Sequence, residues 1–291
     1  MYSRFFALLW ILICFSLPAG CRQEKNVPVI RGDLTGKIVW SGLVQIAGDV
    51  ILADGSSLVI QPGTRIQFLP SESDSNTFVE HPYFPASELI VRGRLLAIGT
   101  AEQPIVFESA DPMSGPGAWG AINVEGSPEA VFEYCHFLQA DSAVHSRDSQ
   151  VYIEQSLFED NQVGIRFHSS QILIENNLLR NNQTGIRFHF DAPVICNNRF
   201  ETNGINLFIT SYPKDYRIEN NQFGKPREYQ VVLGEEVPDD VHMANNYWDG
   251  LNADQVHAQI YDGQRSEYLG RVIVEPMMTS PPRHNGFTWT Q

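Results

Sequence analysis

The chain has 291 residues and carries 20 Lys or Arg against 34 Asp or Glu, which gives a formal net charge of −14. Nucleic acids and anionic membrane surfaces are bound by clusters of basic residues, so this balance argues against both as electrostatic partners. The length is sufficient for one large domain, even after removal of a leader.

The first 20 residues have the pattern of a secretory signal peptide. Arg4 precedes an apolar run from Phe5 to Leu17, and small residues lead from there to Cys21. The run is shorter than the about 20 apolar residues that span a bilayer. We therefore expect residues 1–20 to be removed, which takes away one basic residue and no acidic residue and makes the net charge more negative by one.

The residues before Cys21 resemble the lipobox of bacterial lipoproteins, in which a cysteine after small residues is lipidated and becomes the mature N-terminus. Pro18 stands where that motif usually has leucine. The resemblance implies that a lipid on Cys21 anchors the protein in the membrane. Arg22, rather than aspartate, follows the cysteine, which implies the outer membrane, with the body in the periplasm or on the surface. Plain secretion and an uncleaved anchor remain open alternatives.

The next segment changes from a tether to regular strands. Residues 21–31 are polar and aperiodic, which predicts a tether. From residue 32 to residue 124, short apolar alternations between Gly, Pro and Asp turns predict half-buried strands. Insertions at residues 70–88 and 110–118 interrupt this pattern. Loops of this kind are either functional or tolerated surface insertions, and both interpretations stay open.

A repeat becomes visible from Ala130 onward. Residues 161–168 and 182–189 are identical at seven of eight positions, at an offset of 21 residues. Three columns keep one register over six turns, with offsets of 21, 21, 21, 23 and 25 residues. They are Phe137, Phe158, Leu179, Phe200, Phe223 and Trp248; Phe132, Ile153, Ile174, Ile195, Ile218 and Met243; and Cys135, Ser156, Asn177, Asn198, Asn221 and Asn246. Such a period with strand-like alternation predicts a solenoid.

The period sets the geometry of one turn. About 21 residues accommodate three short strands and three bends, and successive turns stack about 4.8 Å apart. The two apolar columns are then expected inside. The third column is expected at a bend, where Asn tolerates left-handed backbone and where stacked amides can hydrogen-bond along the axis. The predicted fold class is all-β, a single-stranded parallel β-helix.

Three further motifs resemble the right-handed parallel β-helix proteins. They are the segments Leu58–Phe68, Leu89–Thr100 and Asn245–Trp248. The resemblance covers about residues 32–282 and reaches the pectate-lyase-like superfamily and the periplasmic NosD-like proteins. It implies a right-handed coil but no particular reaction. Residues 283–291 are expected to form a flexible tail.

The C-terminal end of the solenoid needs a cover, because an open end exposes strand edges. Asn252 is expected to cap a short helix from Ala253 to Tyr261, which stops at Asp262. Val256 and Ile260 would then lie on the covering face. Residues 270–276 are expected to return as a last strand.

The register also predicts the state of the two remaining cysteines. Cys135 and Cys196 fall in different columns and about three turns apart, which corresponds to about 14 Å along the axis. A disulfide needs Cα atoms within roughly 7 Å. We therefore predict two free thiols, with Cys135 the more buried.

The repeated Gly-Ile-Arg-Phe-His segment supplies the main candidate site. If the Ile and Phe side chains point inward, Arg166 and His168 point outward, and Arg187 and His189 stand one turn above them. One turn earlier, Val144-His145 fits the same Ile-Arg slot and places His145 below Arg166. One turn later, Ile205-Asn206 fits it and places Asn206 above Arg187. The candidate ligand-binding residues are therefore His145, Arg166, His168, Arg187, His189 and Asn206.

Stacked cations repel one another, so this strip needs compensation. Carboxylates such as Asp191 are one source, and a bound anion such as an acidic sugar or a phosphate is another, because it suits the planar donors of arginine. A metal shared by His168 and His189 is a third interpretation, although no third ligand is evident. Duplication of one turn, with outward residues that have no function, is the fourth.

A second outward column contains Glu133, Glu154 and Glu175. Solvated glutamates explain it, and a Ca²⁺ site is the alternative, because calcium prefers oxygen ligands. We predict no resident cofactor beyond that option. Asp141 and Asp160 also lie near the cationic strip in sequence, but the spacing does not assemble an acid–base pair.

Three functions are compatible with this sequence. The first is a lipid-anchored envelope protein that binds acidic polysaccharide without cleaving it. The second is a polysaccharide lyase or hydrolase of the pectate-lyase-like kind. The third is a NosD-like periplasmic accessory, metal-maturation or scaffold protein. We expect a monomer whose partners are an anionic envelope ligand and the membrane, the latter through the lipid on Cys21. The fold alone cannot decide among these functions.

Overall fold

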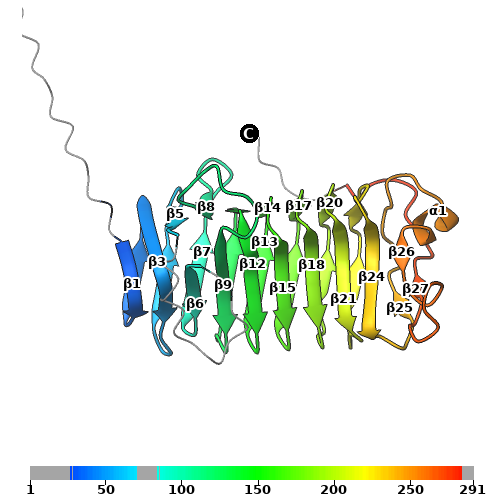
Figure 1. The fold of residues 1–291 in the computed structure, drawn as a ribbon, viewed down its shortest axis with the longest axis horizontal. Coiled ribbons are helices and arrows are strands. Elements are labelled where there is room, and N and C mark those ends of the chain that lie inside the picture. Colours follow the sequence, from blue (N-terminus) through cyan, green and yellow to red (C-terminus); the bar gives the residue numbers. More distant parts are fainter. Residues whose placement is uncertain (1–26, 28, 71–83, 85, 284–291) are drawn as a thin grey trace, which may run out of the picture.

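The computed structural model describes residues 27, 29–70, 84 and 86–283. The expected signal peptide, Cys21, most of the 70–88 insertion and residues 284–291 lie outside the described residues. Within the described part of the chain, no helix is long and apolar enough to cross a membrane. The described residues form one elongated coil of parallel strands that advances turn by turn along its axis (Figure 1).

Each full turn contributes one strand to each of three rows. The groove row, which carries the candidate site, belongs to a 17-stranded sheet. It consists of β3 (Leu43–Leu52), β6 (Glu88–Val91), β9 (Trp119–Glu125), β12 (Ala140–Arg147), β15 (Val163–His168), β18 (Thr184–His189), β21 (Ile205–Ser211), β24 (Tyr229–Glu236) and β26 (Ile260–Tyr261).

The short row belongs to the same sheet, because the long strand β3 pairs with both β5 and β6. It consists of β5 (Arg65–Phe68), β8 (Ile105–Ser109), β11 (Cys135–Leu138), β14 (Leu157–Glu159), β17 (Leu178–Arg180), β20 (Arg199–Glu201) and β23 (Gln222–Phe223).

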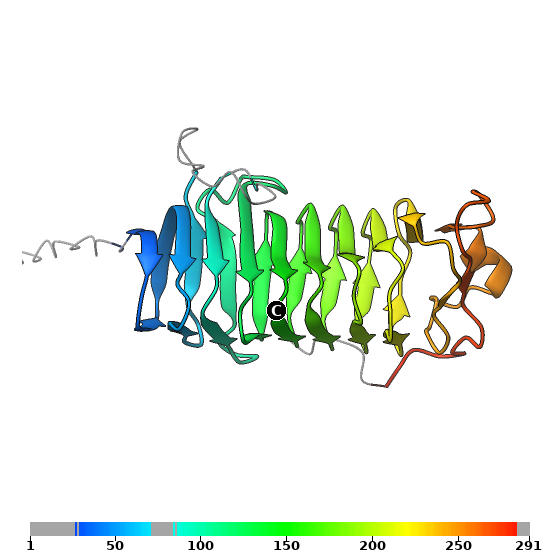
Figure 2. The same cartoon turned by 90° about the horizontal axis from the view of Figure 1, so that it is seen from below.

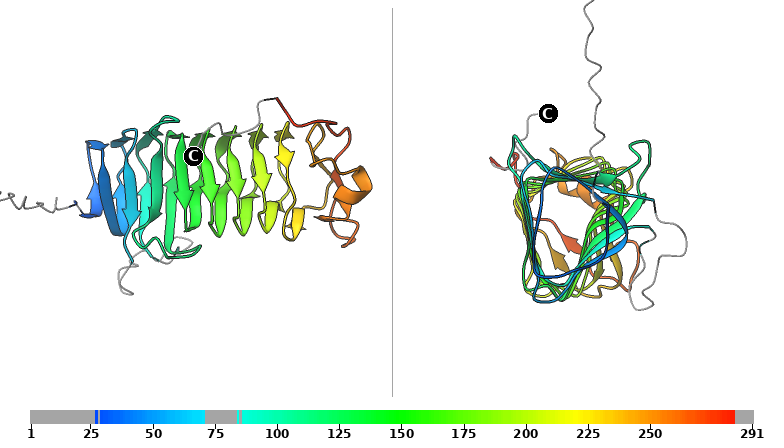
Figure 3. Two further views of the ribbon diagram at one scale, coloured as in Figure 1. Left: turned by 90° about the horizontal axis from the view of Figure 1, so that it is seen from above. Right: turned by 90° about the vertical axis from the view of Figure 1, so that its left-hand side faces the viewer.

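The opposite sheet has eight strands and closes the third side. It consists of β2 (Lys37–Trp40), β4 (Ser57–Ile60), β7 (Arg94–Ile98), β10 (Ala130–Glu133), β13 (Gln150–Glu154), β16 (Gln171–Glu175), β19 (Val194–Cys196) and β22 (Arg217–Glu219). Seen from below, the turns stack side by side, and seen along the axis they superpose around one interior (Figures 2 and 3).

The apolar columns predicted from the repeat lie in this interior. Phe137 pairs with Phe158, Phe158 with Leu179, and Leu179 with Phe200. Ring stacking follows from the register: the ring centroids of Phe137 and Phe158 are 4.5 Å apart. The column ends on Trp248, whose ring stacks 4.4 Å from that of Phe223. Every member is at most 1 % exposed, so the predicted register and fold class are confirmed.

The polar column lies at the corner between the opposite sheet and the short row, as predicted. The left-handed backbone, however, belongs to the residue before each ladder side chain: Asn197 has φ 56° and Asn220 has φ 57°. The ladder residue itself points inward and is fully buried, as Asn198 shows. The prediction that the ladder asparagines adopt the left-handed conformation is therefore wrong by one residue.

The buried asparagines connect each turn to the next. Asn198 Oδ1 accepts the backbone N–H of Asn177 at 3.0 Å. Its Nδ2 donates to Asn221 Oδ1 at 3.1 Å and to the carbonyl of Ile174 at 2.8 Å. Each amide therefore accepts the backbone N–H of a bend residue in the preceding turn and bonds to the amide of the next turn.

A second ladder, which the sequence analysis missed, occupies the corner before the groove row. Asn161, Asn182 and Asn203 are fully buried. Asn161 Nδ2 donates to Asn182 Oδ1 at 2.9 Å, and Asn182 Nδ2 donates to Asn203 Oδ1 at 3.0 Å. The 21-residue spacing of these asparagines was the available signal. This ladder sets the register of the strands that carry the candidate site.

The two ends differ in detail from the prediction. β1 (Val29–Leu34) begins before residue 32 and pairs with β3. The capping helix α1 spans only Ala253–His257, with a capping box at Asn252, and Val256 is fully buried. Ile260 and Tyr261 form β26 instead of its last turn, because they pair with β24. β27 (Val272–Ile273) is the expected last strand and pairs with β25 (Val241–His242).

Cys135 and Cys196 are free thiols, as predicted. Cys135 is 0 % exposed and Cys196 is 4 % exposed. Burial raises the pKa of both thiols above the usual range, so neither is activated for chemistry.

The corner ladder makes a direct prediction. The substitution Asn198→Ala should lower the free energy of unfolding by about 2–4 kcal/mol, because it leaves the N–H of Asn177 buried without a partner and removes the amide bonds to Asn221 and Ile174. The matched control is Asn220→Gly, because glycine readily adopts the positive φ that Asn220 has at the next corner. Denaturant midpoints measure both. Equal midpoints for the two variants would show that the ladder contributes nothing to stability.

Candidate functional site

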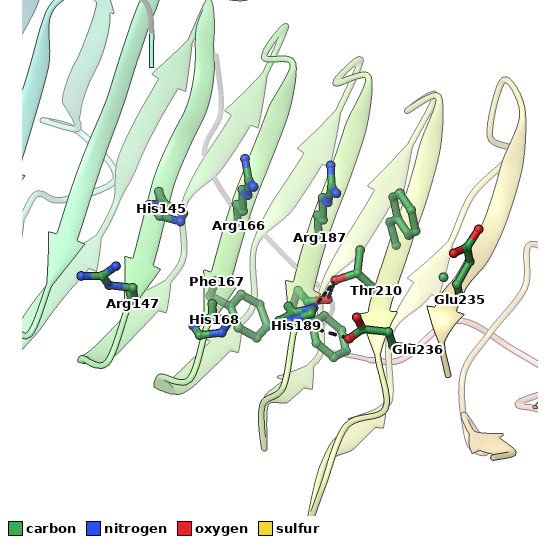
Figure 4. Close-up of a pocket in the computed structure, with 13 residues that line it drawn as sticks. His145, Arg147, Arg166, Phe167, His168, Arg187, His189, Thr210, Glu235 and Glu236 are labelled. Carbon is green, nitrogen blue, oxygen red and sulfur yellow. Dashed lines mark hydrogen bonds and ion pairs between the residues drawn. The ribbon is translucent and has the colours of Figure 1, made fainter. Parts of the chain in front are cut away.

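The repeated segment forms two neighbouring strands of the groove row. In β15 and β18, Arg166 pairs with Arg187 and His168 pairs with His189. The intervening Phe167 and Phe188 point inward and are 1 % exposed. The arginines and histidines are half-buried on the outer face, and Figure 4 shows the two guanidinium groups extending in the same direction. The predicted stacking is therefore present.

His145 lies below Arg166, as predicted, because β12 pairs with β15 in that register. It is 5 % exposed. Its Nδ1 is 2.8 Å from Asn123 Oδ1, and its ring meets the ring of Phe84 edge-on at 5.2 Å. His145 therefore lies at the buried end of the strip and offers little surface to a ligand.

The placement of Asn206 is wrong. Phe208, not Asn206, pairs with Arg187, because the turn keeps its 21-residue offset. Asn206 lies opposite Gly185 and is fully buried. It donates to Gln230 Oε1 at 2.8 Å and accepts from Asn203 Nδ2 at 3.0 Å. The Gly-Ile-Asn of this turn resembles Gly-Ile-Arg locally, but the ladder residue Asn203 sets the register.

The strip lines a groove with a volume of about 580 Å³ (Figure 4). Its walls are His145, Arg147, Arg166, Phe167, His168, Arg187, Phe188, His189, Phe208, Thr210, Gly234, Glu235 and Glu236. A second cavity of about 510 Å³ continues toward the C-terminal end and shares Phe208, Gly234 and Glu235 with the first. It adds the exposed rings of Tyr261 and Tyr268. The groove is thus cationic toward its first turns and aromatic toward its last.

Arg166 and Arg187 have no ion-pair partner among the described residues, whereas Arg147 pairs with Glu125 at 2.6 Å. Burial and the neighbouring Arg187 lower the pKa of Arg166, and Asp141 opposes this effect. The guanidinium of Arg187 lies 5.0 Å from the centre of the Phe208 ring. Two half-buried like charges one turn apart form a site that an anion would stabilise.

The compensating carboxylate is Asp141, and the expectation for Asp191 is wrong. Asp141 acts on Arg166, and burial raises the pKa of its carboxyl against that attraction. Asp191 instead lies at the corner after β18, where its Oδ1 accepts the N–H of Ser170 at 2.6 Å. Asp160 occupies another corner with φ 55°.

The hydrogen bonds of His189 assign its tautomer. The hydroxyl of Ser211 donates to Glu236, and the hydroxyl of Thr210 donates to the carbonyl of Phe188. Both oxygens must therefore accept from His189 Nδ1, at 2.7 and 3.1 Å. Burial, together with His168 and Arg187, lowers the pKa of His189, although Glu236 opposes it. This arrangement favours the tautomer with Nδ1 protonated, and Nε2 then lies 3.9 Å from Glu236 Oε2.

The metal interpretations gain no support from the geometry. The rings of His168 and His189 stack with centroids 5.2 Å apart. Among the described residues, no group of three or more His, Cys, Asp or Glu side chains is placed to hold a metal ion. Glu133, Glu154 and Glu175 do stack on the opposite sheet, as predicted. Burial and the two neighbouring carboxylates raise the pKa of Glu154.

A buried acid at the N-terminal end of the groove row was missed by the sequence analysis. Glu88 is 6 % exposed, and burial, with a further contribution from Asp49, raises its pKa to about 8. Its neighbour Asn123 contacts His145, so this acid lies behind the strip. Asp49 and Glu88 are separated by the 70–88 insertion, and Glu88 and Asn123 by the 110–118 insertion, so no local pattern in the sequence signals this cluster.

A family described as "Right handed beta helix region" matches residues 117–262, which is half of the chain. The match covers β12, β15, β18 and β21 and therefore the whole cationic strip. Neither a curated protein nor a solved structure shows a significant match.

Glu88 generates a prediction for stability against pH. The folded protein retains a proton on this carboxyl that the unfolded chain loses above about pH 4.5, so stability should fall as the pH rises from about 4.5 to about 8. The substitution Glu88→Gln should remove this part of the slope and raise the unfolding midpoint at pH 9. Glu235→Gln, an exposed carboxyl, is the control. An unchanged slope for Glu88→Gln would contradict the assignment.

Proposed function

The chain belongs to the family of right-handed β-helix proteins, and we propose that within this family it is a lipid-anchored envelope protein that binds an acidic polysaccharide in its groove without cleaving it. The observation that carries the proposal is the pair Arg166 and Arg187. They stack on adjacent strands, line the groove and have no described ion-pair partner on a chain with a net charge of −14.

An anionic ligand resolves the electrostatic conflict of this pair. Two guanidinium groups that face one groove repel each other, and the repulsion is strengthened by partial burial. A carboxylate or sulfate between them can accept two or more charge-assisted hydrogen bonds, because each guanidinium presents several donors in a fixed plane. The ligand would therefore supply the direct ion pair that neither arginine has among the described side chains.

The shape of the site favours a polymer over a small anion. The two connected cavities extend from His145 to Tyr268 along several turns. Tyr268 is 78 % exposed and Tyr261 is 37 % exposed, so both offer ring faces at the surface. Flat aromatic rings with a polar hydroxyl suit the apolar faces and hydroxyl edges of sugar rings. An acidic glycan with its acid near Arg166 and Arg187 and further units near the tyrosines uses both ends.

The position of His189 in the groove, with Nε2 as its unprotonated nitrogen, favours one alternative, a polysaccharide lyase. With the uronate carboxylate between the arginines, His189 would take the proton from the adjacent carbon, the C–O bond to the next sugar would break, a C=C bond would form and water would protonate the leaving oxygen. Unsaturated ends detected by their ultraviolet absorbance, and lost in His189→Ala, would establish the lyase. If the wild type produces no unsaturated ends, the lyase is excluded and the binding function stands.

The envelope location rests on the N-terminal sequence. Removal of residues 1–20 and lipidation of Cys21 would attach the body to the outer membrane, because Arg22 is the next residue. β1 begins at Val29, so the tether would be at most residues 21–28. The groove would then work close to the membrane surface.

The central pair provides the test of binding. Arg166→Ala and Arg187→Ala should each weaken binding of an oligogalacturonate by about tenfold or more, since each removes charge-assisted hydrogen bonds of about 1.5–3 kcal/mol. Added salt should weaken the wild-type complex in the same direction. Arg217→Ala, which changes an arginine paired with Glu219 on the opposite sheet, is the control. Isothermal titration gives the affinities. If the groove variants bind as the control does, the function proposed here fails.

The anchor provides a separate test. Cys21→Ser should abolish incorporation of radiolabelled palmitate and leave the precursor at its full length. The wild type should carry the palmitate label and partition into the detergent phase, whereas the variant should carry no label. Labelling of the Cys21→Ser variant to the wild-type extent would overturn the anchor but not the groove.

A further inference from the structure

The outer face of the opposite sheet carries an apolar stripe. The middle residue of each strand points away from the interior, and the strand register places these residues in one column. The apolar stripe consists of Val39, Val59, Leu96, Val131, Tyr152, Leu173 and Val194. Val39 is 61 % exposed and Val59 is 38 % exposed, and the other members are half-buried. A continuous apolar column on an outward face marks a contact surface.

The stripe has an acidic margin. Glu133, Glu154 and Glu175 lie two residues further along their strands than the stripe residues, and they stack in the same register. A cavity of about 230 Å³ lies on this face, with Tyr152 and Leu173 in its lining. The face therefore suits a segment that combines aromatic side chains with basic ones.

The described chain ends close to this sheet. The N–H of Met278 donates to the carbonyl of Asn246 at 3.0 Å, and Asn246 belongs to the ladder at the corner between the opposite sheet and the short row. Pro282 is buried, although Pro281 and Arg283 on either side of it are exposed. Figure 2 shows this segment, in red, returning along the coil from its C-terminal end. The chain thus stays against the body up to the last described residues.

The residues that follow have the composition that the face demands. The tail, residues 284–291, contains Phe287 and Trp289, which point to the same side if the segment is extended. His284 follows Arg283 directly, and residues 276–291 contain no acidic side chain, although the whole chain has 34. Its basic residues therefore complement the acidic margin, and its aromatic residues complement the stripe.

The tail is long enough to reach the stripe. Phe287 follows Met278 by nine residues, which span about 30 Å when extended. The corner of Ser156, at the end of the strand that carries Tyr152, lies four ladder steps from Asn246, which is about 19 Å along the axis. The remaining length covers the distance from the corner to the middle of the sheet.

We propose that the tail folds back along the opposite sheet and docks on the apolar stripe, with Phe287 and Trp289 packed against Tyr152 and Leu173. The tail is then a fixed part of the body, in place of the flexible segment that the sequence suggested. The proposal does not depend on the groove, which belongs to the other sheet.

The fluorescence of Trp289 reports its position. Trp40, Trp119 and Trp248 are at most 5 % exposed, so iodide in solution quenches them little. The difference between the detergent-solubilised full chain and its Trp289→Phe variant isolates the signal of Trp289. We expect iodide to quench this signal weakly in the wild type, because the docked ring is covered.

Three substitutions test whether the stripe provides the cover. Leu173→Ser should raise the quenching of Trp289 severalfold. Phe287→Ser should do the same, and it leaves the body of the protein unaltered. Val39→Ser is the matched control on the same stripe. Val39 lies eight turns from Asn246, or about 38 Å, whereas Trp289 reaches at most about 36 Å from Met278.

Shortening the chain gives a second measurement. A chain that ends at Arg283 should have a thermal midpoint about 2–4 °C lower, because the apolar contacts of the tail are lost. Leu173→Ser should lower the midpoint of the full chain more than that of the shortened chain, since the contact that it disrupts exists only in the former. Val39→Ser should shift both midpoints equally.

Three results would overturn the docked tail. The first is a wild type in which iodide quenches Trp289 as strongly as in Phe287→Ser. The second is a Leu173→Ser variant whose Trp289 is quenched as weakly as that of Val39→Ser. The third is protection of Trp289 that disappears when a dimer dissociates on dilution, which would assign the stripe to a second copy of the chain.

Discussion

The structure depends on one recurring hydrogen bond, in which a buried side-chain oxygen at a corner accepts the backbone N–H of the preceding turn. Asn177 donates its N–H to Asn198, Asn161 to Asn182, and Ser170 to Asp191. Each corner needs one left-handed residue to turn the chain, and the next residue supplies the oxygen. This bond fixes the register of every strand that follows, because pairing begins at the corner.

The groove is a consequence of that register. Once the corners stack, outward side chains one turn apart must also stack, whether or not they attract one another. Arg166 and Arg187 therefore repel across about 4.8 Å of strand spacing, and the fold, not a local partner, holds them there. The same stacking puts Phe208 against Arg187 and brings the aromatic end into line with the cationic end. The groove therefore has a cationic end and an aromatic end, although the interior side chains repeat from turn to turn.

The interior was predictable and the exterior only partly so. The columns through Phe158 and Asn198 could be found because stacking demands equal residues at equal intervals. Asn206 was misplaced because the match of Gly204 and Ile205 to the previous turn is local, whereas the register is counted from the ladder. The predicted length of α1 was too great, because Ile260 pairs with β24 in the sheet instead of continuing the helix. Glu88 escaped notice because its neighbours come from other turns, at distances along the chain that insertions alter. Asp141 was placed near the strip, but its interaction with Arg166 was not predicted, because the two residues belong to different turns and do not share a column.

The claim that the stacked arginines form an anion site can be measured most directly by a diffraction structure of the protein with an oligogalacturonate bound. The account predicts one carboxylate of the ligand within hydrogen-bonding distance of the guanidinium groups of both Arg166 and Arg187, with the next sugar ring toward Phe208. A ligand seated on another face, with both guanidinium groups in contact with solvent alone, would contradict it.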